Sequence, residues 1–436
     1  MNNKGIIASV LIVVLIVLCG ASLFAVWAGV RMVQDSGIHI RLGPYTNAAN
    51  ATETKTLNVS GPADLTVLND FGDVSVLAGA SGQVSVKAEK TAWGRSDAEA
   101  QAALKEVQVV YDQTGNTIKI SVKRPVEVNT LNIDMKSSSV KFTITVPKES
   151  AVTLESVNGA LALTGTSGTA NLHTQFGALN LSEVAAEISA KTQSGAISAT
   201  NIGDGHDLSI SSEFGEITIE GANGAAVTVG SNNGALDLSG VKAGGLLKVT
   251  TEFGEVHVAE STGGSGEFRS NNGAVTLEKV DLGGALSVRS DFGDLRLTKV
   301  SASSYDLNSN NGKISLDGAA GPIKAASQFG EVKVLHAKDA VLDLSSKNGG
   351  ISFSGSLGPG PHSLKSEFGN INLNLPAGVG LDVDLQTEFG KISSDFDVTV
   401  SGGKLDEKHW SGKINSGGAQ LTVKNNNGNI TLQILK

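Results

Sequence analysis

The chain has 436 residues, of which 53 are glycine, 8 are proline and only 4% are aromatic. So few aromatic residues argue against a large globular core and favour a thin core of small aliphatic side chains. The formal net charge of -9 argues against a nucleic-acid interface, because such a surface needs a stripe of lysine and arginine. The single cysteine, Cys19, excludes an intrachain disulfide.

An uncharged apolar segment occupies the N-terminal end of the chain. Residues 5–30 are mostly Ile, Val, Leu and Ala, and a stretch of this length can span a bilayer. We predict that residues 1–31 form a single-pass membrane anchor with the N-terminus inside and the rest of the chain extracytoplasmic; a cleaved signal peptide is the alternative. Leu18 precedes Cys19 where a lipoprotein signal has a small residue, so we expect a membrane-buried thiol rather than a lipidated one.

A linker and a strand-rich region follow the apolar segment. Residues 32–55 are polar and mixed, which predicts a linker. From Thr56 the sequence alternates between apolar and polar residues, which predicts half-buried strands. Within this region we predict one helix, Ser96–Val107, because Ser96 or Asp97 can cap it and an apolar stripe follows. We interpret residues 56–150 as a β-rich module that caps what comes next.

Two short motifs alternate through residues 151–436. Phe-Gly copies such as Phe253-Gly254 recur about 39 residues apart, and an Asn-Gly copy such as Asn272-Gly273 lies near each midpoint. A unit of 19 or 20 residues cannot bury its own apolar face, so it must stack on its neighbours. We therefore predict a single-stranded parallel β-helix, or β-solenoid, of about fifteen coils and a length on the order of 70 Å.

The Phe-Gly and Asn-Gly motifs are assigned to one corner of each coil. Glycine there indicates a left-handed or otherwise crowded turn. We expect the asparagine amides to bond the backbone of a neighbouring coil and the phenylalanine rings to fill the corner; an exposed aromatic track for a ligand is the alternative. The predicted turn positions are Phe214, Gly215, Asn233, Gly234, Phe253, Gly254, Asn272, Gly273, Phe292, Gly293, Asn311 and Gly312.

These features together resemble the DUF4097 family, a group of adhesin-like β-strand-repeat proteins of bacterial envelopes. The resemblance is carried by the opening segment Leu65–Val76, the helix Ser96–Val107, the strand Phe142–Pro147 and the repeated turns. It covers residues 56–436. The resemblance implies an extracytoplasmic, repeat-built and non-catalytic protein, and it supplies no catalytic or ligand-binding motif.

Charged residues near the turns offer the only candidate for metal binding. A pair within one turn, such as Glu252 and Glu255, is a candidate for weak Ca²⁺ binding, although we favour a solvated acidic edge. The carboxylates that flank the turns are Glu213, Glu216, Glu252, Glu255, Asp291, Asp294, Glu331, Glu367 and Glu388.

The histidines do not suggest a metal site, because they lie at different offsets from the turn glycines and form no ladder. They are His39, His173, His206, His257, His336, His362 and His409. We nominate no catalytic residue, no metal site and no cofactor.

The sequence thus predicts a non-enzymatic, membrane-anchored surface protein with an adhesin-like binding or scaffold role. Its expected partners are the membrane, through residues 5–30, and an envelope glycan or another surface protein, but not nucleic acid. Three alternatives remain open: self-association through an open edge of the C-terminal coil at 425–434, a signalling role in envelope stress, and a carbohydrate-active enzyme built on a β-helix.

Overall fold

The computed structural model describes residues 46–124, 138–400 and 406–435. By its internal contacts the chain divides into two compact units. The first comprises Met1–Thr52, Glu89–Gln108 and Lys123–Ser139, and the second comprises Glu53–Ala88, Val109–Val122 and Val140–Lys436. The predicted membrane segment at residues 5–30 lies outside the described residues. Within the described ranges, no helix has both the length and the apolar character needed to cross a membrane.

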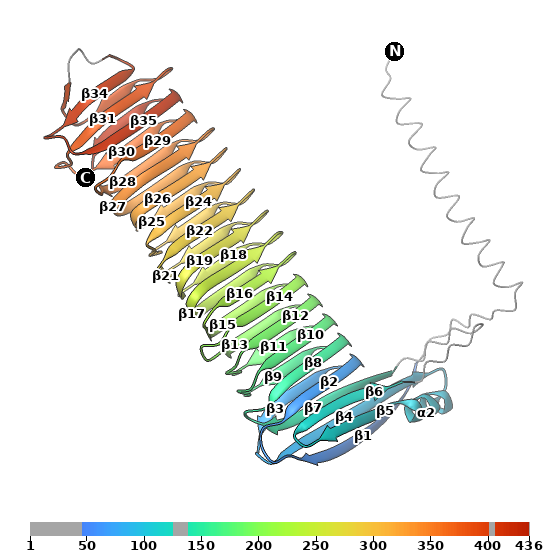
Figure 1. Ribbon diagram of the computed structural model, residues 1–436. Helices are drawn as coiled ribbons and strands as arrows, with labels where there is room; N and C mark the ends of the chain where they lie inside the picture. The colour runs from blue at the N-terminus through green and yellow to red at the C-terminus, as the bar shows by residue number, and fades with distance from the viewer. Residues whose placement is uncertain (1–45, 125–137, 401–405, 436) are drawn as a thin grey trace, which may run out of the picture. The chain divides into compact units, whose positions relative to one another are not determined.

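The first unit contains the predicted helix, α2 (Asp97–Glu106) (Figure 1). Ser96 is its N-cap, and the Ser96 hydroxyl accepts a hydrogen bond from the backbone N–H of Glu99 at 3.3 Å. Ala100, Ala103 and Leu104 form the buried face of the helix and cluster with Ala49 and Ala92. The helix prediction is therefore confirmed, including its cap.

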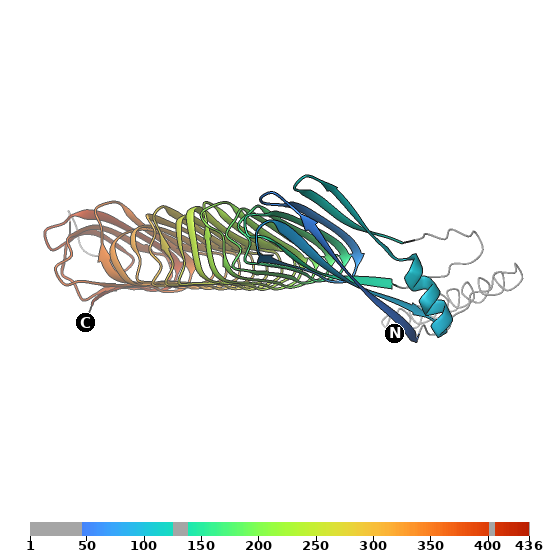
Figure 2. The same ribbon diagram turned by 90° about the horizontal axis from the view of Figure 1, so that it is seen from below.

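The second unit is a β-solenoid (Figures 1 and 2). Each coil has one strand that enters a corner and one strand that leaves it. The entering strands are β8 (Ala151–Asn158), β10 (Ala170–Phe176), β12 (Ile188–Ser194), β14 (Leu208–Phe214), β16 (Val227–Ser231), β19 (Thr262–Ser270), β22 (Ala285–Ser290), β24 (Ser304–Ser309), β26 (Ala320–Ser327) and β29 (His362–Phe368). The leaving strands are β9 (Leu161–Thr164), β11 (Leu179–Ser182), β13 (Ile197–Ile202), β15 (Ile217–Gly224), β18 (Val256–Ala259), β20 (Val275–Glu278), β23 (Leu295–Thr298), β25 (Ile314–Asp317), β28 (Ile351–Leu357) and β30 (Ile371–Leu375).

Two longer strands, β17 (Leu236–Thr251) and β27 (Val332–Ser346), leave one corner and enter the next, and β21 (Asp281–Leu282) is a short link between β20 and β22. The N-terminal part contains β1 (Asn47–Asn58), β4 (Gln83–Gly94) and β5 (Gln108–Thr114), together with four strands that join the solenoid and are described below.

Parallel pairing in register builds the core of the solenoid. In the pairing of β12 with β14, Ile188 lies opposite Leu208 and Ala190 lies opposite Ile210. Side chains of a strand alternate between its two faces, so these inward residues stack into continuous aliphatic ladders. Almost all of them are buried, as the alternation of apolar and polar residues predicts. The thin aliphatic core expected from the composition is therefore present.

The number of successive coils is smaller than predicted. The corner glycines from Gly159 to Gly369 follow one another in both sequence and space and define about eleven turns, rather than fifteen. At a spacing of ~4.8 Å per turn this stretch is about 53 Å long. Of the later turn glycines, Gly428 and Gly390 stack beyond Gly369 out of chain order, and Gly412 lies in β34 (His409–Ile414), a strand that pairs antiparallel to its neighbours.

The C-terminal strands insert into the stack instead of ending it. β35 (Ala419–Asn427) lies between β29 and β31 (Leu381–Thr387), and β36 (Ile430–Ile434) lies between β30 and β32 (Ile392–Ser394). The prediction of an open edge at residues 425–434 is therefore wrong, because hydrogen-bonded neighbours occupy both sides. The outer side of β31 is covered instead by β34, which also pairs antiparallel with β33 (Val398–Val400).

At the N-terminal end of the solenoid, strands are also inserted out of chain order. β2 (Asp64–Phe71) pairs with both β8 and β6 (Thr117–Lys123), and β3 (Val74–Gly79) pairs with both β9 and β7 (Ser138–Pro147). The coil made by β2 and β3 thus lies between the strands β6 and β7 on one side and the first regular coil, made by β8 and β9, on the other. The parallel ladder consequently includes residues from the region that the sequence assigned to a separate capping module.

A buried histidine makes the stability of this unit sensitive to pH. His362 begins β29 with 1% of its surface exposed, and its Nδ1 accepts a hydrogen bond from the backbone N–H of Leu342 at 3.3 Å. Burial lowers the pKa of His362 below its ordinary value of 6.5. The unfolded chain therefore binds the proton first, and stability is lost as the pH falls from 6.5 towards the folded pKa.

We expect the full-length protein to lose more unfolding free energy between pH 8 and pH 5 than a His362→Leu variant does. Urea unfolding of both proteins at each pH measures this difference, and the other titrating groups are common to both. Equal losses in the two proteins would show that His362 does not titrate on unfolding.

Candidate functional site

The glycines of the main corner are required by close stacking of successive coils. A Cβ on Gly293 would lie 1.9 Å from the carbonyl oxygen of Gly273, and a Cβ on Gly312 would meet the carbonyl oxygen of Gly293 at the same distance. Neither glycine has a left-handed φ. Of the two explanations offered by the sequence, crowding is correct here and left-handed geometry is not.

A row of buried hydroxyls joins these glycines along the solenoid. The Ser309 hydroxyl donates to the carbonyl oxygen of Gly293 at 3.1 Å and accepts from the N–H of Gly312 at 2.9 Å. The same donation to a glycine of the adjacent coil is made by Thr174, Thr192, Ser212, Ser231, Thr251, Ser270, Ser290, Ser327, Ser346, Ser366 and Thr387. The sequence reasoning missed this row, although a serine or threonine stands three residues before each corner glycine from Gly159 to Gly390.

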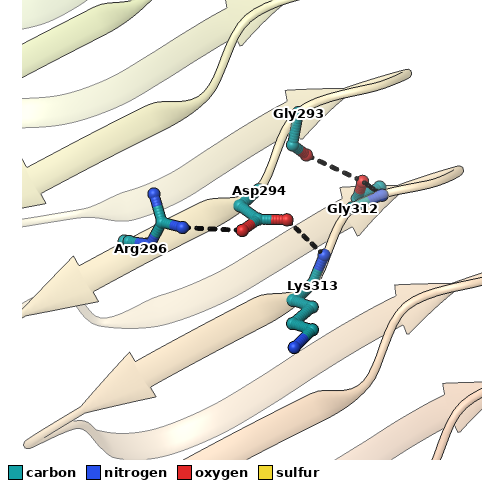
Figure 3. Close-up of polar contacts among 6 residues, drawn as sticks. Gly293, Asp294, Arg296, Gly312 and Lys313 are labelled. Atoms are coloured by element: carbon teal, nitrogen blue, oxygen red, sulfur yellow. Dashed lines mark hydrogen bonds and ion pairs between the residues drawn. The ribbon is translucent and has the colours of Figure 1, made fainter.

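Some corner asparagines and carboxylates are also occupied in joining coils. Asn272 and Asn311 donate from their amides to the backbone carbonyls of Glu252 and Asp291, at 3.4 and 3.2 Å. This confirms the role expected for the asparagine amides. Asp294 accepts from the backbone N–H of Lys313 at 2.9 Å and forms an ion pair with Arg296 at 2.7 Å (Figure 3). The Asp294 carboxylate therefore holds adjacent coils together.

The histidines and carboxylates do not gather into a metal site in the described part of the chain. No group of three or more His, Cys, Asp or Glu side chains there is placed to hold a metal ion. Instead, separate histidines each pair with one aspartate, namely His206 with Asp204, His257 with Asp237, His336 with Asp317 and His409 with Asp384. The Asp204 carboxylate raises the pKa of the exposed His206.

The phenylalanines of the corner are exposed on the outside of the solenoid. The exposed fractions are 54% for Phe214, 55% for Phe253 and 63% for Phe292. The expectation that these rings fill the corner is therefore wrong. The glycines and the buried hydroxyls occupy that space, so the rings are left on the surface. The full exposed set is Phe71, Phe176, Phe214, Phe253, Phe292, Phe329, Phe368 and Phe389.

These eight rings form one regular row, which we call the phenylalanine row. The residue before each corner glycine is phenylalanine in every second coil and asparagine or serine in the coils between. In chain order this alternation fails, because Phe389 follows Phe368. The inserted C-terminal coil restores it, since Asn427 lies opposite Phe368 and between the two rings. Two strand spacings then separate successive rings, about 9.6 Å.

Carboxylates accompany the phenylalanine row at the corner. Glu213, Glu252, Asp291 and Glu367 each precede a phenylalanine, so each of these rings lies next to a carboxylate. The predicted acidic row is thus beside an aromatic one. The combination offers apolar ring faces and hydrogen-bond acceptors at a fixed repeat along one side of the unit.

A groove hollows the same face near the C-terminal end of the row. It has a volume of about 650 Å³ and crosses the five adjacent strands β24, β26, β27, β29 and β35. Gln328 and Glu367, which precede Phe329 and Phe368, contribute to it. The other outward polar side chains are Asn308, Asn310, Ser345, Lys347, Lys365, Lys424 and Asn426. No sequence motif marks this groove, because its last strand, β35, is brought next to β29 only by insertion out of chain order.

Comparison with solved structures gives distant matches. A putative cell adhesion protein from Clostridium sporogenes has 10% identity and a TM-score of 0.17, over 88% of this chain and 100% of that one. A putative adhesin from Bacteroides fragilis has 11% identity and a TM-score of 0.19, over 88% and 97% of the two chains. A putative adhesin from Parabacteroides distasonis has 11% identity and a TM-score of 0.23, over 74% and 97%.

No curated protein matches the sequence. The model of one family, described as Toastrack DUF4097, matches residues 73–288 and 265–433, which together span most of the chain and include the groove and seven of the eight rings of the phenylalanine row. The resemblance seen in the sequence is therefore confirmed, and the chain belongs to the Toastrack DUF4097 family.

Proposed function

We propose that this protein is a non-enzymatic surface-binding protein with an adhesin-like role. In this proposal residues 5–30 anchor the chain in the membrane with the N-terminus inside, and the solenoid lies outside the cytoplasm. The solenoid presents the phenylalanine row to an extended partner of the cell envelope. The anchor follows from the apolar sequence, and the binding role follows from the exposed side chains.

The observation that carries the proposal is the exposure of eight phenylalanines in a single row. Exposed apolar side chains that gather on one side of a protein favour an interaction surface. The corner does not need the rings for its own stability, because the interleaved coils keep the same backbone geometry with asparagine or serine in place of phenylalanine. The regular repeat fits a partner that is itself a repeating polymer, such as an envelope glycan.

Removing the rings should weaken binding without unfolding the solenoid. We expect a Phe253→Ala/Phe292→Ala/Phe329→Ala variant of the full-length protein to bind isolated cell envelopes at least about tenfold more weakly, since truncating aromatic anchors at an interface commonly costs more than 1 kcal/mol each. Co-sedimentation of the detergent-purified protein with envelope fragments measures the binding.

A matched control removes exposed apolar surface outside the row. Leu77 and Leu246 are 40% and 37% exposed and belong to other parts of the coils. A Leu77→Ala/Leu246→Ala variant should bind as the unchanged protein does. Equal binding by the phenylalanine variant and the unchanged protein would refute the role of the row.

A further inference from the structure

The groove beside the phenylalanine row contains three lysines that have no ion-pair partner in the described part of the chain. Lys365 and Lys424 lie directly opposite each other on the adjacent strands β29 and β35, and Lys347 follows directly after the end of the neighbouring strand β27. All three are exposed, and none of them forms an ion pair among the described residues. Like charges directly opposite on neighbouring strands destabilise a sheet. An anion bound between them would remove this repulsion.

The groove is therefore locally basic in an acidic protein. Three lysines and a single carboxylate, Glu367, line it, whereas the whole chain has a net charge of -9. The lysine pair exists only because β35 is inserted next to β29. In chain order β29 would be followed by β31, whose outward residue at this level is Gln386, the partner of Lys424 in the ladder.

The uncharged lining indicates what kind of anion would fit. The amides of Asn308 and Asn426 each offer both donors and acceptors, which suits the hydroxyl groups of sugars. The amides of Asn310 and Gln328 hydrogen-bond each other at 3.0 Å and add only their remaining donors and acceptors. Phe329 and Phe368 follow directly after two lining residues and offer apolar ring faces for the C–H groups of a sugar ring. The groove crosses five strands, roughly 19 Å from first to last, which is long enough for several sugar units of a linear chain.

Two other linear ligands fit less well. A peptide cannot add a strand here, because the strands that form the groove are already paired on both sides along the lining. A nucleic acid carries one phosphate per ~3.4 Å of each strand and would meet the carboxylates that accompany the phenylalanine row. A carboxylate-bearing polysaccharide has fewer charges per unit length and can alternate ionic contacts with hydroxyl contacts.

We propose that this groove binds a linear polysaccharide that carries carboxylate groups, with Lys365 and Lys424 binding one carboxylate and Lys347 assisting. The inference rests on the proposed surface-binding function and names the class of ligand. It adds a specific anionic subsite at one end of the phenylalanine row.

The test compares two polymers with the same backbone. Polygalacturonate carries a carboxylate on each sugar, and its highly methyl-esterified form lacks most of these charges. Isothermal titration of the full-length protein in detergent should show clear binding of polygalacturonate and much weaker binding of the ester. A Lys365→Gln/Lys424→Gln variant should bind polygalacturonate about tenfold more weakly, because two of its charged contacts are removed.

The control variant removes the same net charge outside the groove. Lys333 and Lys338 are exposed and do not line the groove. A Lys333→Gln/Lys338→Gln variant should keep the affinity of the unchanged protein. Four results would each overturn the assignment. Two concern affinity for polygalacturonate: no binding at all, or equal weakening in both lysine variants. The other two are equal binding of the two polymers and tighter binding of a single-stranded oligonucleotide. If one of these results were obtained while the phenylalanine variant still lost envelope binding, the polysaccharide assignment would be wrong and the proposed surface-binding function would still be supported.

Discussion

Deleting residues 419–436, which form β35 and β36, is expected to unravel the end of the solenoid. These strands are inserted, so their loss leaves β29 and β30 without the neighbours that connect them to β31 and β32. Leu421, Val423, Ile430 and Leu432 are fully buried, and losing them removes roughly 6–12 kcal/mol of apolar burial, at about 1.5–3 kcal/mol for each side chain. Coils of a solenoid depend on their nearest neighbours, so strands β31, β32, β33 and β34 should lose their order.

Hydrogen–deuterium exchange measures this effect segment by segment. Backbone amides of residues 381–394 should exchange far faster in the deletion variant, while those of residues 188–258 keep their protection. A variant that lacks only Leu435 and Lys436, beyond the last paired strand, is the matched control and should behave as the full chain does. Full protection of residues 381–394 in the larger deletion would show that β35 and β36 are not inserted.

Replacing one corner glycine by alanine should have the next largest effect. The Cβ of a Gly293→Ala variant would lie 1.9 Å from the oxygen, 2.3 Å from the carbon of the Gly273 carbonyl, and 2.6 Å from the backbone nitrogen of Ala274. All three atoms are backbone atoms held in the parallel ladder, so none can rotate away. We expect destabilisation of at least about 3 kcal/mol, the upper end of the usual cost of overpacking. The adjacent hydroxyls, Ser290 and Ser309, would also lose their bonding geometry.

Chemical denaturation of the full-length proteins, followed by circular dichroism, tests this expectation. Gly378→Ala is the matched control, because nothing lies within 4 Å of the Cβ that it adds and the φ of Gly378 is not left-handed. The control should unfold at nearly the same denaturant concentration as the unchanged protein. If Gly293→Ala did the same, coil stacking at this corner would be looser than the structure shows.

Local patterns in the sequence were sufficient to predict the solenoid. Alternating apolar residues, a unit too short to bury itself and a glycine at each corner are properties of single coils, and each coil repeats them. The helix at Asp97–Glu106 was equally predictable, because its cap and its apolar stripe lie within a dozen residues. The row of serine and threonine hydroxyls was also visible in the sequence, three residues before each corner glycine from Gly159 to Gly390, although it was not recognised.

The exposure of the phenylalanine rings could not be read from their spacing. A repeat of about 39 residues places the rings at equivalent positions but does not say whether those positions point inward or outward. The distance between stacked corner glycines decides this, since a gap that cannot admit one Cβ cannot admit a ring. Periodic aromatic residues are usually part of a core, so the sequence pattern predicted that the rings point inward, whereas they lie on the surface.

The sequence by itself determined the repeat, the type of coil and the family, whereas the order of the coils at the ends was decided only in three dimensions. Any parallel coil presents similar donors and acceptors on both of its edges, so local pattern does not specify which coil becomes its neighbour. At both ends the chain uses this freedom, placing β2 and β3 between β6–β7 and β8–β9, and β35 and β36 between β29–β30 and β31–β32. The pairing of Lys365 with Lys424 and the unbroken alternation of the phenylalanine row depend on that choice, because they join residues that are far apart in the chain and adjacent only across a strand interface.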